Sequence, residues 1–451
     1  MDNEKFFHIY GHNKTVGLFT LGCRVNQYET EAMAEKFISE GYSVVNFEDH
    51  ADVYVINTCT VTNMGDKKSR QMIHRARRKN KRAIIAVVGC YSQISPGKVS
   101  KIEGVDVVLG TRNKGDIIYF IKKACLEQNK IIEVGDVLKN RVFEDLSIDK
   151  YQHRTRAFVK IQDGCNRFCS YCLIPFARGA VCSKPPSKIL EEVEKLAHNN
   201  FREITLSGIH IASYGTDLKS GWDLMKILEE VDGVSGIERV RIGSIDPKFF
   251  TDDVIDRIKK LKKLCPHFHL SLQSGCDETL RRMNRHYTAL EYERIVNELR
   301  NKIEDVSITT DVIVGFPGET EDEFNKTYDF LKKMKLSKIH VFKYSPRKGT
   351  RAADMKGQID GKVKEERSGE IIKLDRKLEK KFMGSFLGRN MDVFYESKFH
   401  GDNNCYEGYT PNYMKVVSMG KSGENPVGKI LRTELESVES GYIRGKIKSF
   451  I

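Results

Sequence analysis

The stretch "DGCNRFCSYCLIP", residues 163–175, holds three cysteines within eight residues: Cys165, Cys169 and Cys172. Structural zinc takes four ligands, usually as paired C-x-x-C units, and the nearest further cysteine, Cys182, lies ten residues downstream. Thiolates also hold iron–sulfur clusters, normally through four cysteines, so three of them on a four-iron cluster leave one iron open. The spacing favours an open iron–sulfur cluster, with a zinc site as the alternative.

The cysteine stretch follows a predicted strand, "AFVKI" (157–161), the first of six predicted strands between residues 156 and 344. The other five are predicted at 203–208, 238–243, 268–272, 307–315 and 339–344, with helical patterns between them. Such alternation is typical of a parallel sheet, and six units are too few for a complete eight-unit barrel. We therefore predict a partial (β/α)6 barrel whose cysteines lie at the strand ends, where barrel active sites form.

A second set of cysteines lies in a predicted parallel α/β domain near the N-terminus. Its strands are predicted at 16–21, 53–57, 83–88 and 105–109, and Cys23, Cys59 and Cys90 each follow one of the first three. Open sheets bind ligands at the carboxyl ends of their strands, so the three thiols are expected to converge. Three separate buried cysteines are the alternative, because free cysteine is common in protein cores. The repeated position favours a cluster.

The 451 residues are too many for one core, and we predict three domains. They are an N-terminal α/β domain (1–140), a partial barrel (151–383) and a small all-β barrel (385–451), with a polar linker over about 127–155. Period-two patterns with Gly-rich turns after residue 388 indicate the β barrel. The fold class is therefore α/β with an all-β C-terminal module.

Charge favours an anionic partner, nucleic acid first, since the formal net charge is +13. Residues 67–82 carry nine Lys or Arg and no acid, which fits either a solvated helix face or a phosphate-contacting helix. The chain contains no stretch of 18 apolar residues, and its first residues lack a secretory signal, so we expect a cytosolic protein. We also expect a monomer. An odd number of cysteines, eleven, argues against a disulfide framework.

The chain resembles the radical S-adenosylmethionine methylthiotransferase family, and this resemblance covers nearly its whole length. Two motifs carry it: "TLGCRVNQYETE" (20–31) and "DGCNRFCSYCLIPFARG" (163–179). They look closest to the branch that acts on N6-threonylcarbamoyladenosine in tRNA. The isopentenyladenosine branch typically begins "YGCQMN", and the ribosomal-protein branch typically has Asp-Ser where this chain has Glu29 and Thr30. One departure is "RGAVCSK" (178–184), where the family usually carries further arginines.

The resemblance implies two [4Fe–4S] clusters, one on Cys23, Cys59 and Cys90 and one on Cys165, Cys169 and Cys172. It also implies S-adenosylmethionine as cofactor and tRNA as partner. The implied reaction adds a methylthio group to C2 of the modified adenosine next to the anticodon. Methylthiolation of isopentenyladenosine tRNA or of a ribosomal protein is an alternative, and a non-catalytic, zinc-bearing RNA-binding protein is another.

Further site residues follow from the same resemblance. Polar groups at later strand ends are expected to contact the cofactor or substrate, with structural hydrogen bonding as the alternative: Ser207, Gly208, His210, Ser244, Gln273 and Asp311. Three arginines after the fourth and sixth barrel strands are candidates to grip the threonyl carboxylate, with surface salt bridges as the alternative: Arg281, Arg285 and Arg347.

The C-terminal barrel resembles the TRAM module, an OB-like RNA-binding fold. Its charged and aromatic residues are expected to face RNA: Lys415, Arg432, Arg444, Lys446, Tyr406, Tyr409 and Tyr413.

Overall fold

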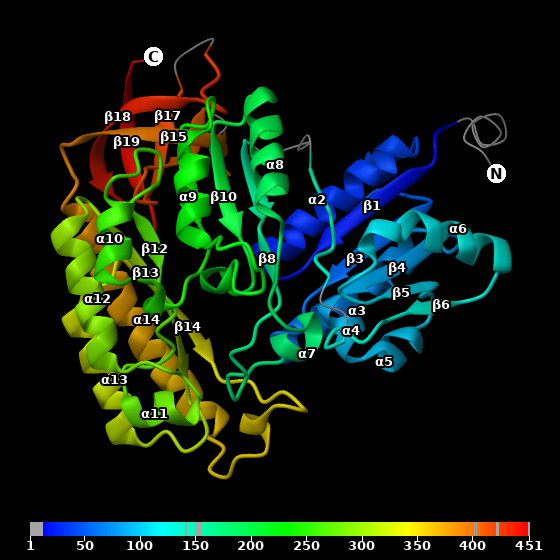
Figure 1. Cartoon of the computed structure of the whole chain (residues 1–451), viewed down its shortest axis with the longest axis horizontal. Coiled ribbons are helices and arrows are strands. Elements are labelled where there is room, and N and C mark those ends of the chain that lie inside the picture. Colours follow the sequence, from blue (N-terminus) through cyan, green and yellow to red (C-terminus); the bar gives the residue numbers. More distant parts are fainter. Residues whose placement is uncertain are drawn as a thin grey trace.

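A computed structural model describes residues 12–139, 142–148, 155–400, 402, 404–420 and 424–449. It confirms the predicted fold class: a parallel α/β domain, a partial α/β barrel and a closed β barrel (Figure 1). No helix among these residues is long and apolar enough to cross a membrane.

The N-terminal domain is a six-stranded parallel sheet in the order β2-β1-β3-β4-β5-β6. Its strands are β1 Thr15–Thr20, β2 Ser43–Val45, β3 Val53–Thr58, β4 Ile84–Gly89, β5 Val107–Leu109 and β6 Ile131–Glu133. Its helices are α2 Arg24–Ser39, α3 Asn63–Lys79, α4 Cys90–Ile94, α5 Pro96–Ser100 and α6 Ile117–Glu127. Separate apolar cores cover the two sheet faces, which explains why the central strand β3 is buried throughout.

The second domain consists of two three-stranded parallel sheets, β11-β10-β7 and β12-β13-β14, joined by single bridges such as Val240 to Leu264. Its strands are β7 Arg156–Lys160, β10 Glu203–Ser207, β11 Arg239–Ile242, β12 His267–His269, β13 Ser307–Val314 and β14 Lys338–Lys343. Its helices are α7 Ile174–Arg178, α8 Pro186–His198, α9 Leu224–Gly233, α10 Asp252–Ile258, α11 Asp277–Arg282, α12 Ala289–Lys302, α13 Glu321–Met334 and α14 Gly361–Gly384. All six predicted strands are present.

Short elements complete the helical and sheet structure. The hairpin of β8 Gln162–Asp163 and β9 Cys182–Ser183 closes the loop that carries the three clustered cysteines. Four 3-10 turns cover η1 Lys114–Asp116, η2 Ile211–Ser213, η3 Pro247–Phe249 and η4 Arg351–Ala353.

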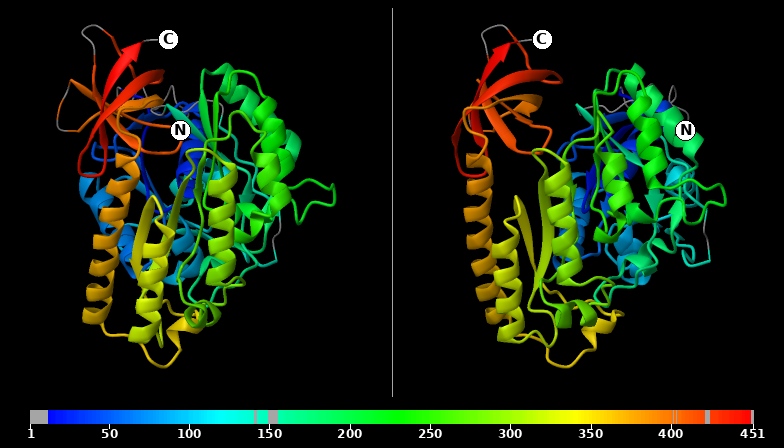
Figure 2. Two further views of the ribbon diagram at one scale, coloured as in Figure 1. Left: turned by 90° about the vertical axis from the view of Figure 1, so that its left-hand side faces the viewer. Right: turned by 60° about the vertical axis from the view of Figure 1, so that its left-hand side comes forward.

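The C-terminal barrel closes in the order β15-β16-β17-β19-β18. Its strands are β15 Asn390–Lys398, β16 Cys405–Tyr409, β17 Lys415–Met419, β18 Ile430–Val438 and β19 Ile443–Ser449. Helix α14 runs along the second domain and leads into this barrel (Figure 2). The barrel covers the amino ends of the second domain's strands, where Arg239 and Arg241 of β11 donate to backbone carbonyls of Asp392, Tyr409, Thr410 and Pro411.

Five strands do not follow from the sequence pattern: β2, β6, β8, β9 and β16. β6 lies inside the predicted linker and adds an edge strand to the N-terminal sheet through parallel pairing with β5. Strand β6 has three residues, too few to show a periodic pattern, and β2 has the same length.

Candidate active site

The structure brings the three N-terminal strand ends together. Cys23 is the N-cap residue of α2, Cys59 directly follows β3, and Cys90 begins α4. Gly22 has a φ of 98°, and a Cβ built on it would lie 2.9 Å from Cys59 Sγ. Gly89 has a φ of 97°, and a Cβ there would lie 2.5 Å from Asn57 Oδ1. Only glycine permits this close approach, which allows the cysteine-bearing loops to meet.

Burial and neighbouring charges change the pKa values of two N-terminal thiols, Cys59 and Cys90. Burial raises the pKa of Cys59 to about 11, and the nearby Cys90 and Cys23 contribute to the rise. Burial also raises the pKa of Cys90, while Arg178 opposes that rise. Free thiols with raised pKa values are protonated at neutral pH, so metal binding at this site has to release protons.

The second thiol site lies in the loop between β8 and α7. Its sulfurs accept hydrogen bonds from three donors: Arg167 N to Cys165 (3.5 Å), Ile174 N to Cys172 (3.4 Å) and Arg285 Nη1 to Cys169 (3.4 Å). All three cysteines are partly exposed. Burial raises the pKa of Cys172 to about 12, and the neighbouring Cys169 and Cys165 contribute to the rise.

Both thiol sites fit an iron–sulfur cluster. Hydrogen bonds to the sulfurs and partial solvent access are features that set the potentials of such clusters. A single metal ion requires its donors to converge on one point, and the described ranges contain no group of three His, Cys, Asp or Glu placed in that way. Three thiolates at each site are donors that suit an iron–sulfur cluster.

A buried charge network connects the two thiol sites. Arg178, fully buried in α7, lies 2.8 Å from Glu29 of α2 and 3.1 Å from Asp163 of β8. Arg178 Nη2 also donates to Asn26 Oδ1 at 2.6 Å, and Asn26 Nδ2 donates to the carbonyls of Leu21 and Thr58 next to the N-terminal thiols. Each thiol site is therefore tied to the other through one guanidinium.

Further cations complete this network. Lys160 lies 2.8 Å from Glu29 and 2.7 Å from Asp163, and Lys114 lies 3.1 Å from Glu29. Burial alone raises the pKa of both carboxyls, but Arg178 holds each pKa well below its usual range. Lys114 and Lys160 add to this effect at Glu29, and Lys160 and Arg112 add to it at Asp163. Glu29 and Asp163 are therefore ionised inside the protein, and their charges depend on the cations around them.

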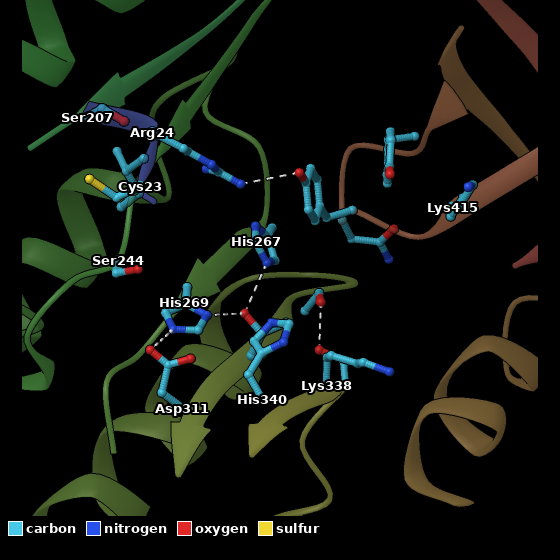
Figure 3. Close-up of a pocket in the computed structure, with 18 of the residues that line it drawn as sticks. Cys23, Arg24, Ser207, Ser244, His267, His269, Asp311, Lys338, His340 and Lys415 are labelled. Atoms are coloured by element: carbon cyan, nitrogen blue, oxygen red, sulfur yellow. Dashed lines mark hydrogen bonds and ion pairs between the residues drawn. The ribbon is translucent and has the colours of Figure 1, made fainter. Parts of the chain in front are cut away.

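A cavity of about 710 Å³ lies between the three domains, in the range expected for a small-ligand site. Cys23 of the N-terminal thiol site lines it, and so does Ile174, whose backbone N donates to Cys172 Sγ of the second site. Four predicted contact residues also line it: Ser207, Gly208, Ser244 and Asp311 (Figure 3). His267, His269 and His340 line it as well, with His269 Nε2 3.2 Å from Asp311 Oδ2.

Two predicted contact residues lie outside the cavity lining. His210 Nε2 is 3.3 Å from Arg167 Nε and 3.5 Å from Asp246 Oδ2, behind the second thiol loop. Gln273 is buried with a φ of 70°, and its backbone N donates to Asp311 O. Their predicted roles in cofactor contact stay predictions.

The three predicted carboxylate-binding arginines lie outside the cavity lining as well. Arg281 is exposed on α11 beside Glu278. Arg285 contacts Cys169 Sγ and Tyr287, which puts its charge beside the second thiol site. Arg347 is buried and bridges the second domain to α3 through Asp66 at 2.7 Å. Substrate contact by these residues stays a prediction, and the structure gives each of the three another partner.

Sequence reasoning missed Arg24, Asn26, Asp163 and Arg178 as site residues. Asp163 and Arg178 flank the three clustered cysteines, and Arg24 and Asn26 lie one and three residues after Cys23. Proximity to the cysteines was the available signal, but the sequence does not show which of these side chains point inwards.

A family model described as the Radical SAM superfamily matches residues 159–331, and one described as uncharacterized protein family UPF0004 matches residues 15–110. A solved structure of the radical S-adenosylmethionine methyltransferase TsrM from Kitasatospora setae shares the fold at 14% identity and a TM-score of 0.57, covering 76% of this chain and 77% of TsrM. The fold and the three-thiol loop define a radical S-adenosylmethionine enzyme, which uses that cofactor and a [4Fe–4S] cluster.

Three relatives identify the family more closely. Threonylcarbamoyladenosine tRNA methylthiotransferase MtaB of Bacillus subtilis is 43% identical, covering 95% of this chain and 94% of the relative. The protein of the same name from Aquifex aeolicus is 39% identical over 92% of this chain and 99% of the relative. The tRNA-2-methylthio-N(6)-dimethylallyladenosine synthase of Caldicellulosiruptor saccharolyticus is 35% identical, covering 99% of this chain and 95% of the relative. The chain belongs to the radical S-adenosylmethionine methylthiotransferase family.

Proposed function

We propose that this chain adds a methylthio group to C2 of N6-threonylcarbamoyladenosine next to the anticodon in tRNA. The observation that carries the proposal is that one cavity is lined by Cys23 of the first thiol site and by Ile174, whose backbone N donates to Cys172 Sγ of the second. The relatives with 43% and 39% identity, both named for threonylcarbamoyladenosine, support this substrate over dimethylallyladenosine.

The residues of the chain have separate tasks in this reaction. Cys165, Cys169 and Cys172 would hold the cluster that binds S-adenosylmethionine, and Cys23, Cys59 and Cys90 would hold a second cluster. When bound, these groups supply the radical that removes the C2 hydrogen and the methylthio group that replaces it. Ser207, Gly208 and Ser244 would contact the cofactor from the cavity wall. The enclosing domains would keep water from the reacting carbon.

Nucleoside mass analysis of tRNA from cells with and without the gene tests this function. We expect cells without it to lose 2-methylthio-N6-threonylcarbamoyladenosine and to accumulate the form that lacks the methylthio group. Loss of the methylthio group from the isopentenyl nucleoside, or from a ribosomal protein, would instead assign the chain to another substrate. If neither the tRNA nucleosides nor the ribosomal protein differ between the two kinds of cells, the alternative of a non-catalytic, zinc-bearing RNA-binding protein is favoured.

The proposal also includes a monomeric state and a division into three domains, at 1–140, 151–383 and 385–451. A monomer is consistent with a cavity that the three domains of one chain form together. Light scattering on the iron-loaded protein tests it, and a dimer mass would contradict it.

A further inference from the structure

The charged groups that line the cavity differ in their partners. Lys338 pairs with Asp375 at 3.0 Å and Glu379 at 2.7 Å, and Lys415 pairs with Glu407 at 2.7 Å. Arg24 also lines the cavity, yet no carboxylate lies within ion-pair distance of it in the described part of the chain. Arg24 Nη2 donates to Tyr413 OH at 3.3 Å, and the guanidinium lies 5.8 Å from the centre of the Phe158 ring.

The surroundings of Arg24 disfavour a positive charge. Tyr413, to which Arg24 donates, also has the guanidiniums of Arg156 and Arg241 at 5.5 and 4.7 Å from its ring centre, so three cations gather around one ring. Arg24 is also the first residue of α2, where the helix dipole favours negative charge. A partly buried cation without an ion-pair partner is costly, and a ligand that supplies a negative charge removes that cost. The position therefore suits an anion that enters the cavity.

We propose that Arg24 binds the carboxylate of the threonylcarbamoyl group of the target base and thereby selects this substrate. The inference rests on the proposed function. A guanidinium can hold a carboxylate through two parallel hydrogen bonds, and Arg24 extends beside Cys23 into the cavity (Figure 3). Because Arg24 directly follows Cys23, a base held by this guanidinium lies next to the N-terminal thiol site. An uncharged isopentenyl group would leave Arg24 without a counter-charge.

A carboxylate in this cavity has two sources, the threonyl group of the base and the methionine part of S-adenosylmethionine. An RNA phosphate is a third anion that a guanidinium binds. The experiment has to separate these three, and it has to do so without relying on turnover.

Affinities of the iron-loaded protein are compared for three anticodon stem-loop RNAs. At the target position, the first RNA carries N6-threonylcarbamoyladenosine, the second carries its carboxylate methyl ester, and the third carries adenosine. The variants are Arg24→Met and Arg24→Lys, and Arg257→Met is the matched control, because Arg257 is a partly exposed arginine of α10 that pairs with Glu229 at 2.7 Å. Cleavage of S-adenosylmethionine without RNA is measured in parallel.

We expect the wild type and the control to bind the acid about tenfold or more tightly than the ester, the size of one charge-assisted interaction. Arg24→Met should bring this ratio close to one, and Arg24→Lys should keep part of it. Cleavage of S-adenosylmethionine without RNA should be the same for the wild type and for Arg257→Met, and the Arg24 variants are compared with both. The ratio is measured within one preparation, so partial unfolding of a variant does not affect it.

Three results would overturn the inference. Retention of the full acid-to-ester ratio in Arg24→Met would remove Arg24 from carboxylate binding. Equal weakening for all three RNAs would assign Arg24 to a phosphate, and slower cofactor cleavage without RNA would assign it to the methionine carboxylate. A wild type without preference for the threonylcarbamoyl RNA would contradict the proposed function itself, which is a separate outcome.

Discussion

Arg178 Nη1 lies 2.8 Å from Glu29 Oε1, and this contact joins the loop of the second thiol site to the helix that begins after Cys23. Both side chains are fully buried. Arg178 also influences the pKa of Cys90, so one guanidinium acts on both thiol sites. The relative placement of the two sites therefore depends on a salt-bridge network rather than on apolar packing alone.

Replacing Arg178 with Met is expected to destabilise the protein by about 3 kcal/mol or more, because it leaves Glu29 and Asp163 buried with fewer cations. Thermal unfolding followed by circular dichroism should show a lower midpoint. Arg257→Met breaks a partly exposed pair with Glu229 and should change stability by at most about 1 kcal/mol. Equal midpoints for both variants would mean that the network does not hold the domains together.

Much of the fold was predictable because its strands are apolar and regularly spaced. β3 and β4 are central and buried on both faces, so their sequences are nearly continuous apolar runs. β16, "CYEGY", lacks such a run, and its pairing with β15 and β17 defines it only in three dimensions. Short edge strands and barrel strands of this kind depend on long-range contacts that the sequence pattern does not express.

The candidate site was predictable in part, for a different reason. Cysteines at strand ends have few alternative roles, so their convergence followed from the topology of a parallel sheet. The arginines were harder to assign, because a long charged side chain can reach several partners. Arg347 pairs with Asp66 and Arg24 points into the cavity, and this distinction follows from how the three domains pack together.

Iron content tests the assignment of the two clusters. Reconstituted protein is expected to bind two four-iron clusters, and replacing Cys165, Cys169 and Cys172 with Ala should halve the iron, because each site supplies its own thiolates. Cys182→Ala is the matched control, since Cys182 is a buried cysteine in β9 close to the same loop, and it should keep all the iron. Undiminished iron in the triple variant would show that the second site does not bind a cluster.

Replacing Cys23, Cys59 and Cys90 with Ala should separate cofactor cleavage from transfer. The second thiol site keeps its ligands in this variant, so S-adenosylmethionine should still be cleaved to 5′-deoxyadenosine. No methylthiolated nucleoside should form, because the variant lacks the thiols that we propose to hold the cluster supplying the methylthio group. Liquid chromatography with mass detection measures both products in one reaction. Normal amounts of methylthiolated product would exclude the N-terminal thiols from the reaction.

The C-terminal barrel has an internal role that changes how RNA binding should be tested. Tyr413 stacks on Tyr409 at 4.8 Å and on His267 at 4.6 Å. These tyrosine rings, which the sequence predicts to face RNA, are partly buried and line the cavity. Deleting the barrel would also remove the carbonyl partners of Arg239 and Arg241. Truncation after Gly384 is therefore expected to destabilise the second domain, and surface substitutions are a cleaner test of RNA binding.

Two exposed basic faces are expected to contact tRNA phosphates. On α3, Lys67, Lys68 and Arg78 are exposed, and no ion pair is formed by them among the described residues. On β19, Arg444 and Lys446 are exposed and lie two residues apart, so they share one face of the strand. Changing each set to Gln should weaken tRNA binding for all sequences alike, since phosphate contacts carry no base information.

Binding measured across salt concentrations gives the number of phosphates that these side chains neutralise. Each substitution that removes a phosphate-binding charge should reduce the slope of log affinity against log salt by about 1. Arg257→Met removes a positive charge that belongs to neither face and should leave the slope unchanged. A reduced slope for the α3 set alone would assign tRNA binding to the N-terminal domain, and a reduced slope for the β19 set alone would assign it to the barrel. If neither set changes the slope, both basic faces are excluded as phosphate-binding surfaces.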